Sequence, residues 1–86
     1  MGVPKVIMYT SPWCGYCARA RTLLADKGVA FEEIDVEVVP GAREQMSLRS
    51  GGCSSVPQIF INDEHIGGSD ELHALDAAGR LDPKLK

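Results

Sequence analysis

A short apolar segment, a turn, two cysteines and a helical segment follow one another near the N-terminus. Residues 3–9 are largely apolar and end at the turn residues Ser11-Pro12. The pair Cys14 and Cys17 comes next, and residues 16–27 form a helical segment that Gly28 ends. This order predicts a strand, a turn and a helix, with a C-x-x-C pair at the junction between the turn and the helix.

The position of this pair predicts different roles for its two cysteines. The first N–H groups of a helix have no intrahelical partner, and the helix dipole is positive at that end, so we expect the thiolate of Cys14 to be stabilised. Cys17 lies one turn further on, on the same face as Ala20 and Leu24, and should be shielded and less ionised. Three residues make nearly one turn, so the two sulfurs can form a disulfide. We therefore expect Cys14 to attack and Cys17 to resolve.

Length, charge and cysteine number limit the class of protein. A chain of 86 residues is expected to form a single domain over 1–86. A net charge of −3 gives no reason to expect binding to nucleic acid or to an anionic membrane. We find no apolar run long enough to span a membrane and no signal peptide. Three cysteines are an odd number for a structural disulfide framework. These features predict a cytoplasmic protein in a reducing environment.

The remaining segments predict an α/β fold of the order βαβαββα. The expected strands are residues 3–9, 31–36, 58–61 and 64–67. The expected helices are residues 16–27, residues 40–49, and a last helix that has Ser69 or Asp70 as its cap. Leu72, Leu75 and Ala78 should face inward from this last helix, and a short tail should begin at Leu81. The first two strands should be parallel and the last two antiparallel, which gives a four-stranded mixed sheet flanked by helices.

Three motifs resemble those of the glutaredoxin family. The Cys14-Gly15-Tyr16-Cys17 segment resembles the Cys-Pro-Tyr-Cys of dithiol glutaredoxins, and Ser55-Val56-Pro57 resembles their Thr-Val-Pro segment. Gly67-Gly68-Ser69-Asp70 is similar to their glutathione-binding loop. The likeness covers essentially the whole chain and is strongest to short bacterial glutaredoxins of the glutaredoxin-three type. It implies a thioredoxin-like fold.

The resemblance also implies a glutathione-binding groove. Its residues would be Tyr16, Arg43, Val56, Pro57, Gly68, Ser69 and Asp70. The backbone of Val56 would pair with the cysteinyl part of glutathione, and Pro57 would be cis and face Cys14. Ser69 and Asp70 would bind the γ-glutamyl end, and Arg43 would lie near the glycine carboxylate.

The family resemblance implies a glutathione-dependent thiol–disulfide oxidoreductase. It would reduce glutathione mixed disulfides and protein disulfides, with glutathione as co-substrate, and would be a monomer without a cluster. The chain departs from the usual pattern where Gly15 replaces proline and where Ser11 replaces a lysine. The loop at residues 51–55 is one residue longer than usual and lacks its arginine.

Two other functions are consistent with these cysteines. Glutaredoxins whose motif lacks the proline include cluster binders, so a homodimer could hold a [2Fe–2S] cluster through Cys14 of each subunit and two glutathione thiolates. A structural zinc site would need Cys53, His65 and His73 to converge with the C-x-x-C pair, at an irregular spacing. The simpler expectation makes Cys53 a bystander and both histidines surface residues. Trp13 and Tyr16 are expected to be exposed walls of the substrate groove.

Overall fold

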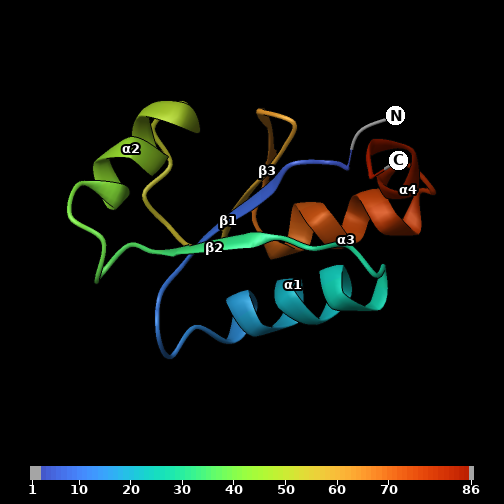
Figure 1. Ribbon diagram of the computed structural model, residues 1–86, viewed down its shortest axis with the longest axis horizontal. Helices are drawn as coiled ribbons and strands as arrows, with labels where there is room; N and C mark the ends of the chain where they lie inside the picture. Colours follow the sequence, from blue (N-terminus) through green and yellow to red (C-terminus); the bar gives the residue numbers. More distant parts are fainter. Residues whose placement is uncertain (1–2, 86) are drawn as a thin grey trace.

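A four-stranded mixed sheet forms the centre of the computed structural model, which describes residues 3–85 (Figure 1). The strands are β1 (Val6–Thr10), β2 (Glu32–Asp35), β3 (Gln58–Ile61) and β4 (Glu64–Gly67). They lie in the order β2-β1-β3-β4, with β2 parallel to β1 and the other neighbours antiparallel. This topology confirms the predicted βαβ unit, the predicted hairpin and the thioredoxin-like α/β fold.

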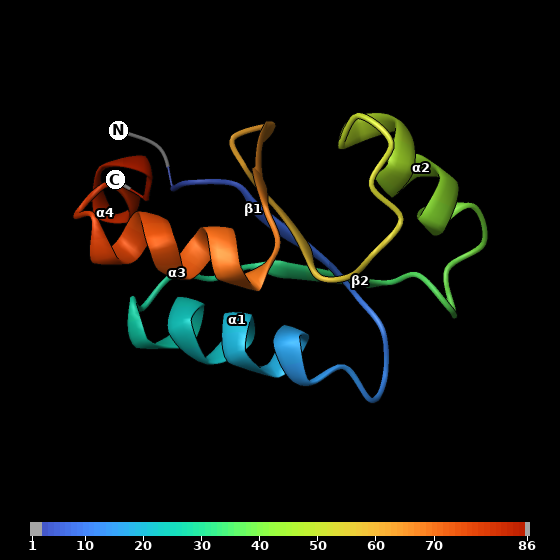
Figure 2. The same cartoon turned by 180° about the vertical axis from the view of Figure 1, so that it is seen from behind.

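Helices cover both faces of the sheet, as Figures 1 and 2 show from opposite sides. The helices are α1 (Gly15–Asp26), α2 (Ala42–Arg49), α3 (Ser69–Ala77) and α4 (Leu81–Lys84). On one face α1, α3 and α4 contribute Leu24, Leu72 and Leu81 to a core cluster. On the other face α2 contributes Ala42 and Met46 to a second cluster. The sheet therefore separates two small cores.

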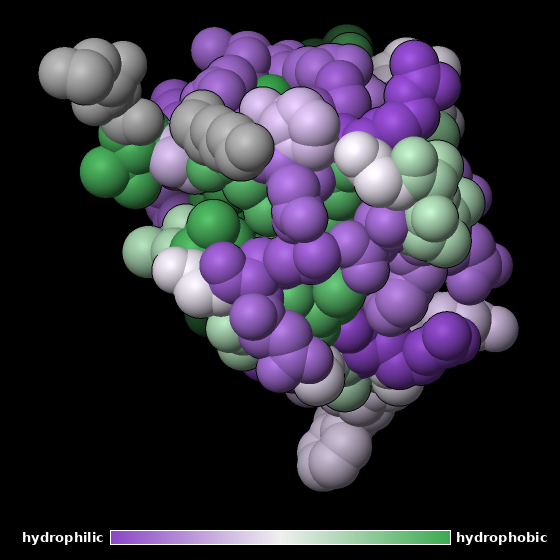
Figure 3. Space-filling model, turned by 90° about the vertical axis from the view of Figure 1, so that its right-hand side faces the viewer, coloured by the Kyte–Doolittle hydropathy of each residue, from purple (hydrophilic) through white to green (hydrophobic). Residues whose placement is uncertain are grey.

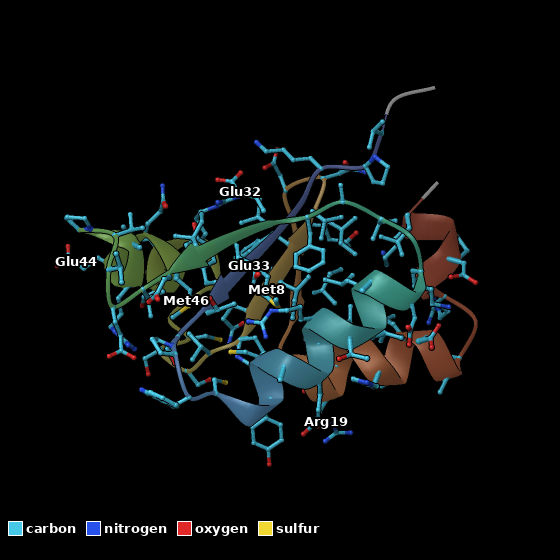
Figure 4. All side chains as sticks on the ribbon, turned by 60° about the horizontal axis from the view of Figure 1, so that its bottom comes forward. Met8, Arg19, Glu32, Glu33, Glu44 and Met46 are labelled. Carbon is cyan, nitrogen blue, oxygen red and sulfur yellow. The ribbon has the colours of Figure 1, made fainter. Side chains whose placement is uncertain are left out.

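The strand β1 is buried along its whole length because it contributes to both cores. Val6 and Met8 pack with α1 and α3, while Ile7 and Tyr9 pack under α2. Successive side chains of a strand point to opposite faces, which produces this alternation. In Figure 4 the labelled Met8 and Met46 both lie in the interior of the molecule. Both are completely buried, as expected for core methionines.

Several predicted boundaries are wrong by one to three residues. The strand β1 starts at Val6, α1 starts at Gly15, and α2 starts at Ala42, after Pro40 in the preceding turn. The α3 cap is Gly68 instead of Ser69 or Asp70. Local propensity sets the type of an element more firmly than its ends, which depend on capping contacts.

The segment after Gly79 was predicted to be a tail, but it forms α4. Leu81 is completely buried and Leu85 nearly so, and both join the core cluster of α1 and α3. Lys27, just after α1, forms ion pairs with Asp76 of α3 and Asp82 of α4, which raise the pKa of its ammonium group. Ala78, predicted to face inward, is exposed after the end of α3. Burial of two leucines explains why this short segment is ordered.

The end of the molecule that carries α4 faces the viewer in Figure 3, where hydrophobic residues show between hydrophilic ones. An open groove of about 790 Å³ is lined by residues of β4, α3 and α4, among them Ile66, Leu75 and Lys84.

Within residues 3–85, no helix combines the length and apolar character needed to cross a bilayer.

Candidate active site

Cys14 lies at the N-terminus of α1, as the sequence predicts. It is the N-cap residue, with extended backbone (φ −102°, ψ 109°). Its Sγ accepts a hydrogen bond from the backbone N–H of Cys17 at 3.1 Å. This contact occupies one of the backbone N–H groups that have no intrahelical partner at the start of a helix. Cys14 is half-buried, so an incoming disulfide can reach it.

The loop before β3 lies opposite Cys14. The Val56–Pro57 peptide bond is cis, which confirms the geometry that the family resemblance implies. The thiol of Cys14 donates a hydrogen bond to the carbonyl oxygen of Val56, with an Sγ–O distance of 3.8 Å. The two segments therefore meet at the reactive sulfur, although 42 residues separate them in the sequence.

Cys17 is the shielded member of the pair, as predicted. Its side chain is completely buried beside Ala20 and Leu24. Burial raises the pKa of the Cys17 thiol to about 12, and its hydrogen bond with Cys14 contributes in the same direction. Cys17 is therefore held as the neutral thiol near neutral pH.

The residues that flank the cysteines are open to solvent. Trp13 is fully exposed and has a left-handed backbone, with φ of 64°. Non-glycine residues adopt this conformation at a cost, and such residues cluster at functional sites. Tyr16 is 57% exposed, and both aromatic residues are thus exposed as predicted. A side chain at Gly15 would meet open space, so the turn does not need glycine for steric reasons.

Charged groups on α1 divide into two kinds. Arg19 extends from the helix into solvent in Figure 4. Arg21 instead forms an ion pair with Glu33 of β2, whose carboxylate lies 2.7 Å from its Nη2. This pair raises the pKa of the Arg21 guanidinium, which stays charged in any case. Arg19 is therefore the more available of the two cations.

The N-terminus of α3 adjoins the loop that contains cis-Pro57. A Cβ at Gly68 would lie 3.3 Å from the carbonyl oxygen of Pro57, so the two segments pack closely. Ser69 is buried and Asp70 is exposed. The N–H of Gly68 donates to Oε1 of Glu71 at 2.7 Å, which caps the helix in place of the predicted serine or aspartate. The structure thus brings together two of the segments predicted to bind glutathione.

Arg43 lies on α2, beside the same loop. Its Nη1 donates to the carbonyl oxygen of Ser54 at 3.2 Å, and the side chain is otherwise exposed. Arg43 therefore adjoins the segment that leads to Val56.

Sequence reasoning missed a pair of polar residues behind this loop. Gln58 is almost completely buried, and its side-chain amide bonds both to His65 and to Ser55. His65 was predicted to be a surface residue, but its ring is half-buried against Phe60. A polar residue at the start of the apolar run Ile59-Phe60-Ile61 was the available signal for a buried, bonded side chain.

The structure does not assemble the zinc site considered from sequence. Within residues 3–85, no three side chains of the metal-binding types His, Cys, Asp or Glu come together as a ligand group. Cys53 is half-buried, and its thiol contacts the carbonyl oxygen of Ser50 at 3.5 Å. His73 bonds to the Ser69 backbone, with Nδ1 2.9 Å from its carbonyl oxygen.

A thioredoxin-like fold with a cysteine pair at a helix N-terminus, facing a cis-proline, defines a class of thiol–disulfide oxidoreductases. Comparison with known proteins narrows this class. Residues 6–66 match the family model described as Glutaredoxin. The chain is 53% identical to glutaredoxin 3 of Escherichia coli over 82 residues, which cover 95% of this chain and 98% of that protein. This chain belongs to the glutaredoxin family, as a dithiol member with glutathione-dependent thiol–disulfide oxidoreductase activity.

Solved structures agree with this relationship. The solution structure of glutaredoxin from Brucella melitensis is 50% identical, superposes with a TM-score of 0.85, and matches 100% of this chain and 92% of that one. The crystal structure of a buckwheat glutaredoxin–glutathione complex is 26% identical, with a TM-score of 0.87 over 95% of this chain and 76% of that one.

Proposed function

We propose that Cys14 is the nucleophile and Cys17 the resolving cysteine of this glutaredoxin. The observation that carries the proposal is the unequal environment of the two sulfurs. Cys14 Sγ accepts the Cys17 N–H at the helix terminus, whereas Cys17 is buried with a raised pKa. Of the two sulfurs, Cys14 is therefore the one that is placed to attack an incoming disulfide.

Two reactions follow from these roles. In the first, the Cys14 thiolate attacks the glutathione sulfur of a glutathionylated protein, so that the mixed disulfide breaks, a Cys14–glutathione disulfide forms and the protein thiol leaves with a proton. The thiolate of a second glutathione then attacks this intermediate, which releases glutathione disulfide and restores the Cys14 thiolate. In the second, the Cys14 thiolate attacks a protein disulfide, so that a mixed disulfide between Cys14 and the substrate forms and the other substrate sulfur leaves as a thiolate. Cys17 then attacks the Cys14 sulfur, which forms the internal disulfide and breaks the mixed disulfide, and the departing substrate thiolate takes the Cys17 proton. Two glutathione molecules afterwards reduce that disulfide.

We further propose that glutathione binds where the start of α1, the cis-Pro57 loop and the N-terminus of α3 meet. The unpaired first-turn N–H groups of α3 suit the γ-glutamyl carboxylate, and the exposed Asp70 suits its ammonium group. The backbone of Val56, beside Cys14, suits the cysteinyl part. Arg43 is available for the glycine carboxylate, with Tyr16, Pro57 and Gly68 as walls. The close packing of Gly68 on Pro57 supports a shared groove.

The roles of the two cysteines can be separated with single variants. Cys14→Ser should lose all activity on a small glutathione mixed disulfide, measured through glutathione reductase and NADPH. Cys17→Ser should keep that activity and lose reduction of a protein disulfide. Cys53→Ser is the matched control, because Cys53 lies outside the pair, and it should resemble the wild type. Full activity of Cys14→Ser on the mixed disulfide would show that Cys14 is not the nucleophile.

We propose that the chain acts as one domain over 1–86, and as a cytoplasmic monomer when no cluster is bound. Its partners would be glutathione, glutathionylated proteins and proteins with disulfides. The three cysteines within residues 3–85 are free thiols, which suits a reducing environment.

We propose cluster binding as a second capacity. The motif lacks proline at Gly15, the space beside Gly15 is open, and Cys14 is only half-buried. One chain cannot complete a ligand set from its described residues, so a [2Fe–2S] cluster would need Cys14 of two subunits and two glutathione thiolates.

Anaerobic reconstitution with iron, sulfide and glutathione tests this capacity. Wild type and Cys17→Ser should become coloured and elute as dimers, while Cys14→Ser should stay colourless and monomeric. A colourless wild-type protein would exclude the cluster, and colour in Cys14→Ser would show other ligands.

A further inference from the structure

We propose that Gln58 and His65 form a positioning pair that fixes the Ser55–Val56 peptide unit for glutathione binding. This inference rests on the proposed use of the Val56 backbone in the groove. Neither residue touches the reacting sulfur, so their effect would be exerted through the backbone.

The amide of Gln58 is buried and bonded at both ends. The residue is 4% exposed at the start of β3. Its Nε2 donates to the carbonyl oxygen of Ser55 at 3.0 Å, and its Oε1 lies 2.7 Å from Nε2 of His65. Because Oε1 can only accept, His65 must donate from Nε2. The amide is therefore held in one orientation, with its donor end toward Ser55.

The position of His65 depends on the pairing of β3 with β4. His65 lies opposite Phe60, and their ring centroids are 5.1 Å apart. The register shifts between Ile59 and Phe60, and such irregularities redirect side chains. The imidazole is thus packed against an aromatic ring while its N–H points to Gln58. This arrangement limits the rotation of both side chains.

The consequence for the groove follows from peptide geometry. The Ser55 carbonyl and the Val56 N–H belong to one planar unit and point in opposite directions. A hydrogen bond that fixes the Ser55 carbonyl toward Gln58 therefore also fixes the direction of the Val56 N–H. The Val56 carbonyl in turn accepts the thiol of Cys14. The pair thus supports the backbone on which both glutathione and the nucleophile depend.

The rest of this loop also depends on side-chain contacts, because it has no regular secondary structure. Ser50 Oγ accepts the N–H of Cys53 at 3.2 Å, and Arg43 binds the Ser54 carbonyl. Gln58 provides the last of these contacts before Val56. A loop without strand pairing changes its backbone direction more easily when such a contact is removed.

The test compares glutathione kinetics in two variants. Gln58→Met keeps the side-chain length but removes both hydrogen bonds, and His65→Phe keeps a ring against Phe60 but removes the donor. Loss of one hydrogen bond corresponds to about a 5-fold weaker interaction. We expect the KM for glutathione to rise about 5-fold or more in Gln58→Met and about 2- to 5-fold in His65→Phe, with kcat nearly unchanged. His65→Gln, which supplies an amide donor, should restore the KM toward the wild-type value.

Tyr9→Phe is the matched control. The Tyr9 hydroxyl lies in the same buried layer and bonds to Gln45 and Arg49, but not to the loop. This variant should lower the Tm and leave the KM for glutathione unchanged. If the KM rises equally in Tyr9→Phe, the effect comes from packing of the core in general and the positioning role is rejected. An unchanged KM in Gln58→Met and His65→Phe would also overturn the proposal.

Two further outcomes are distinguishable. If Gln58→Met does not fold, His65→Phe and His65→Gln decide the question by loss and rescue of the KM. If the wild type itself shows no glutathione-dependent turnover, the proposed site fails, whereas normal wild-type turnover with unaltered variants rejects only the positioning role.

Discussion

At the scale of single residues, one helical turn gives two cysteines opposite environments. Cys14 receives a backbone N–H at the helix N-terminus, whereas Cys17 is covered by the core and is completely buried. Burial stabilises the neutral form of an acid, and for this reason the pKa of Cys17 rises to about 12. The protonation of the Cys17 thiol therefore affects both the redox site and the stability of the reduced protein.

The raised pKa of Cys17 predicts a stability that falls in alkaline solution. The folded protein holds this proton more tightly than the unfolded chain, so the contribution is fully present below the ordinary thiol pKa and is lost as the pH rises toward about 12. Urea unfolding of reduced wild type should show a free energy of unfolding that decreases above about pH 9 more steeply than in Cys17→Ser. Parallel pH dependence in the two proteins would contradict the buried thiol.

At the scale of elements, short segments are ordered by what they bury. The helix α4 has only four residues, too few for stability from helix propensity alone. Leu81 and Leu85 attach it to the cluster formed by α1 and α3, and the ion pairs of Lys27 lie beside this contact. The segment thus acts as part of the core although its sequence resembles a tail.

Leu81→Ala should destabilise the protein strongly. Truncation of a fully buried leucine costs about 2–5 kcal/mol in the free energy of unfolding, from lost burial and the remaining cavity. Leu48→Ala, the same change on α2 at a residue 84% exposed, should alter it by less than about 0.5 kcal/mol. Chemical denaturation followed by far-UV circular dichroism measures both. A small effect of Leu81→Ala would mean that α4 is not part of the core.

At the scale of the whole molecule, two cores share one sheet. Adjacent residues of β1, such as Met8 and Tyr9, belong to different clusters, and β3 divides its residues in the same way. Neither cluster can lose its packing without disturbing strands that the other requires. The molecule should therefore unfold as one unit.

Variants on opposite faces of the sheet test this cooperativity. Met46→Ala and Leu72→Ala truncate completely buried residues of the two clusters. Each should lower the free energy of unfolding by about 2–5 kcal/mol and leave a single unfolding transition. Near-UV and far-UV circular dichroism should give coincident unfolding curves in both variants. Two separate transitions, one sensitive to each variant, would show that the cores unfold independently.

Sequence patterns were enough to predict the order of the elements up to α3, the mixed sheet and the location of Cys14 at a helix start. These features depend on local periodicity, turn residues and spacing, which act over a few neighbouring positions. The sequence also predicted the shielding of Cys17, because one turn of helix places that residue on the face of Ala20 and Leu24.

Which distant groups meet became clear from the folded structure alone. The bond from Gln58 to His65 depends on the register of two strands, and the burial of Leu81 depends on the packing of three helices. Local propensity carries little information about such contacts, since their free energy arises only when the chain has folded. For this reason, the reactive cysteines could be found from the sequence, whereas the supports of their binding groove could not.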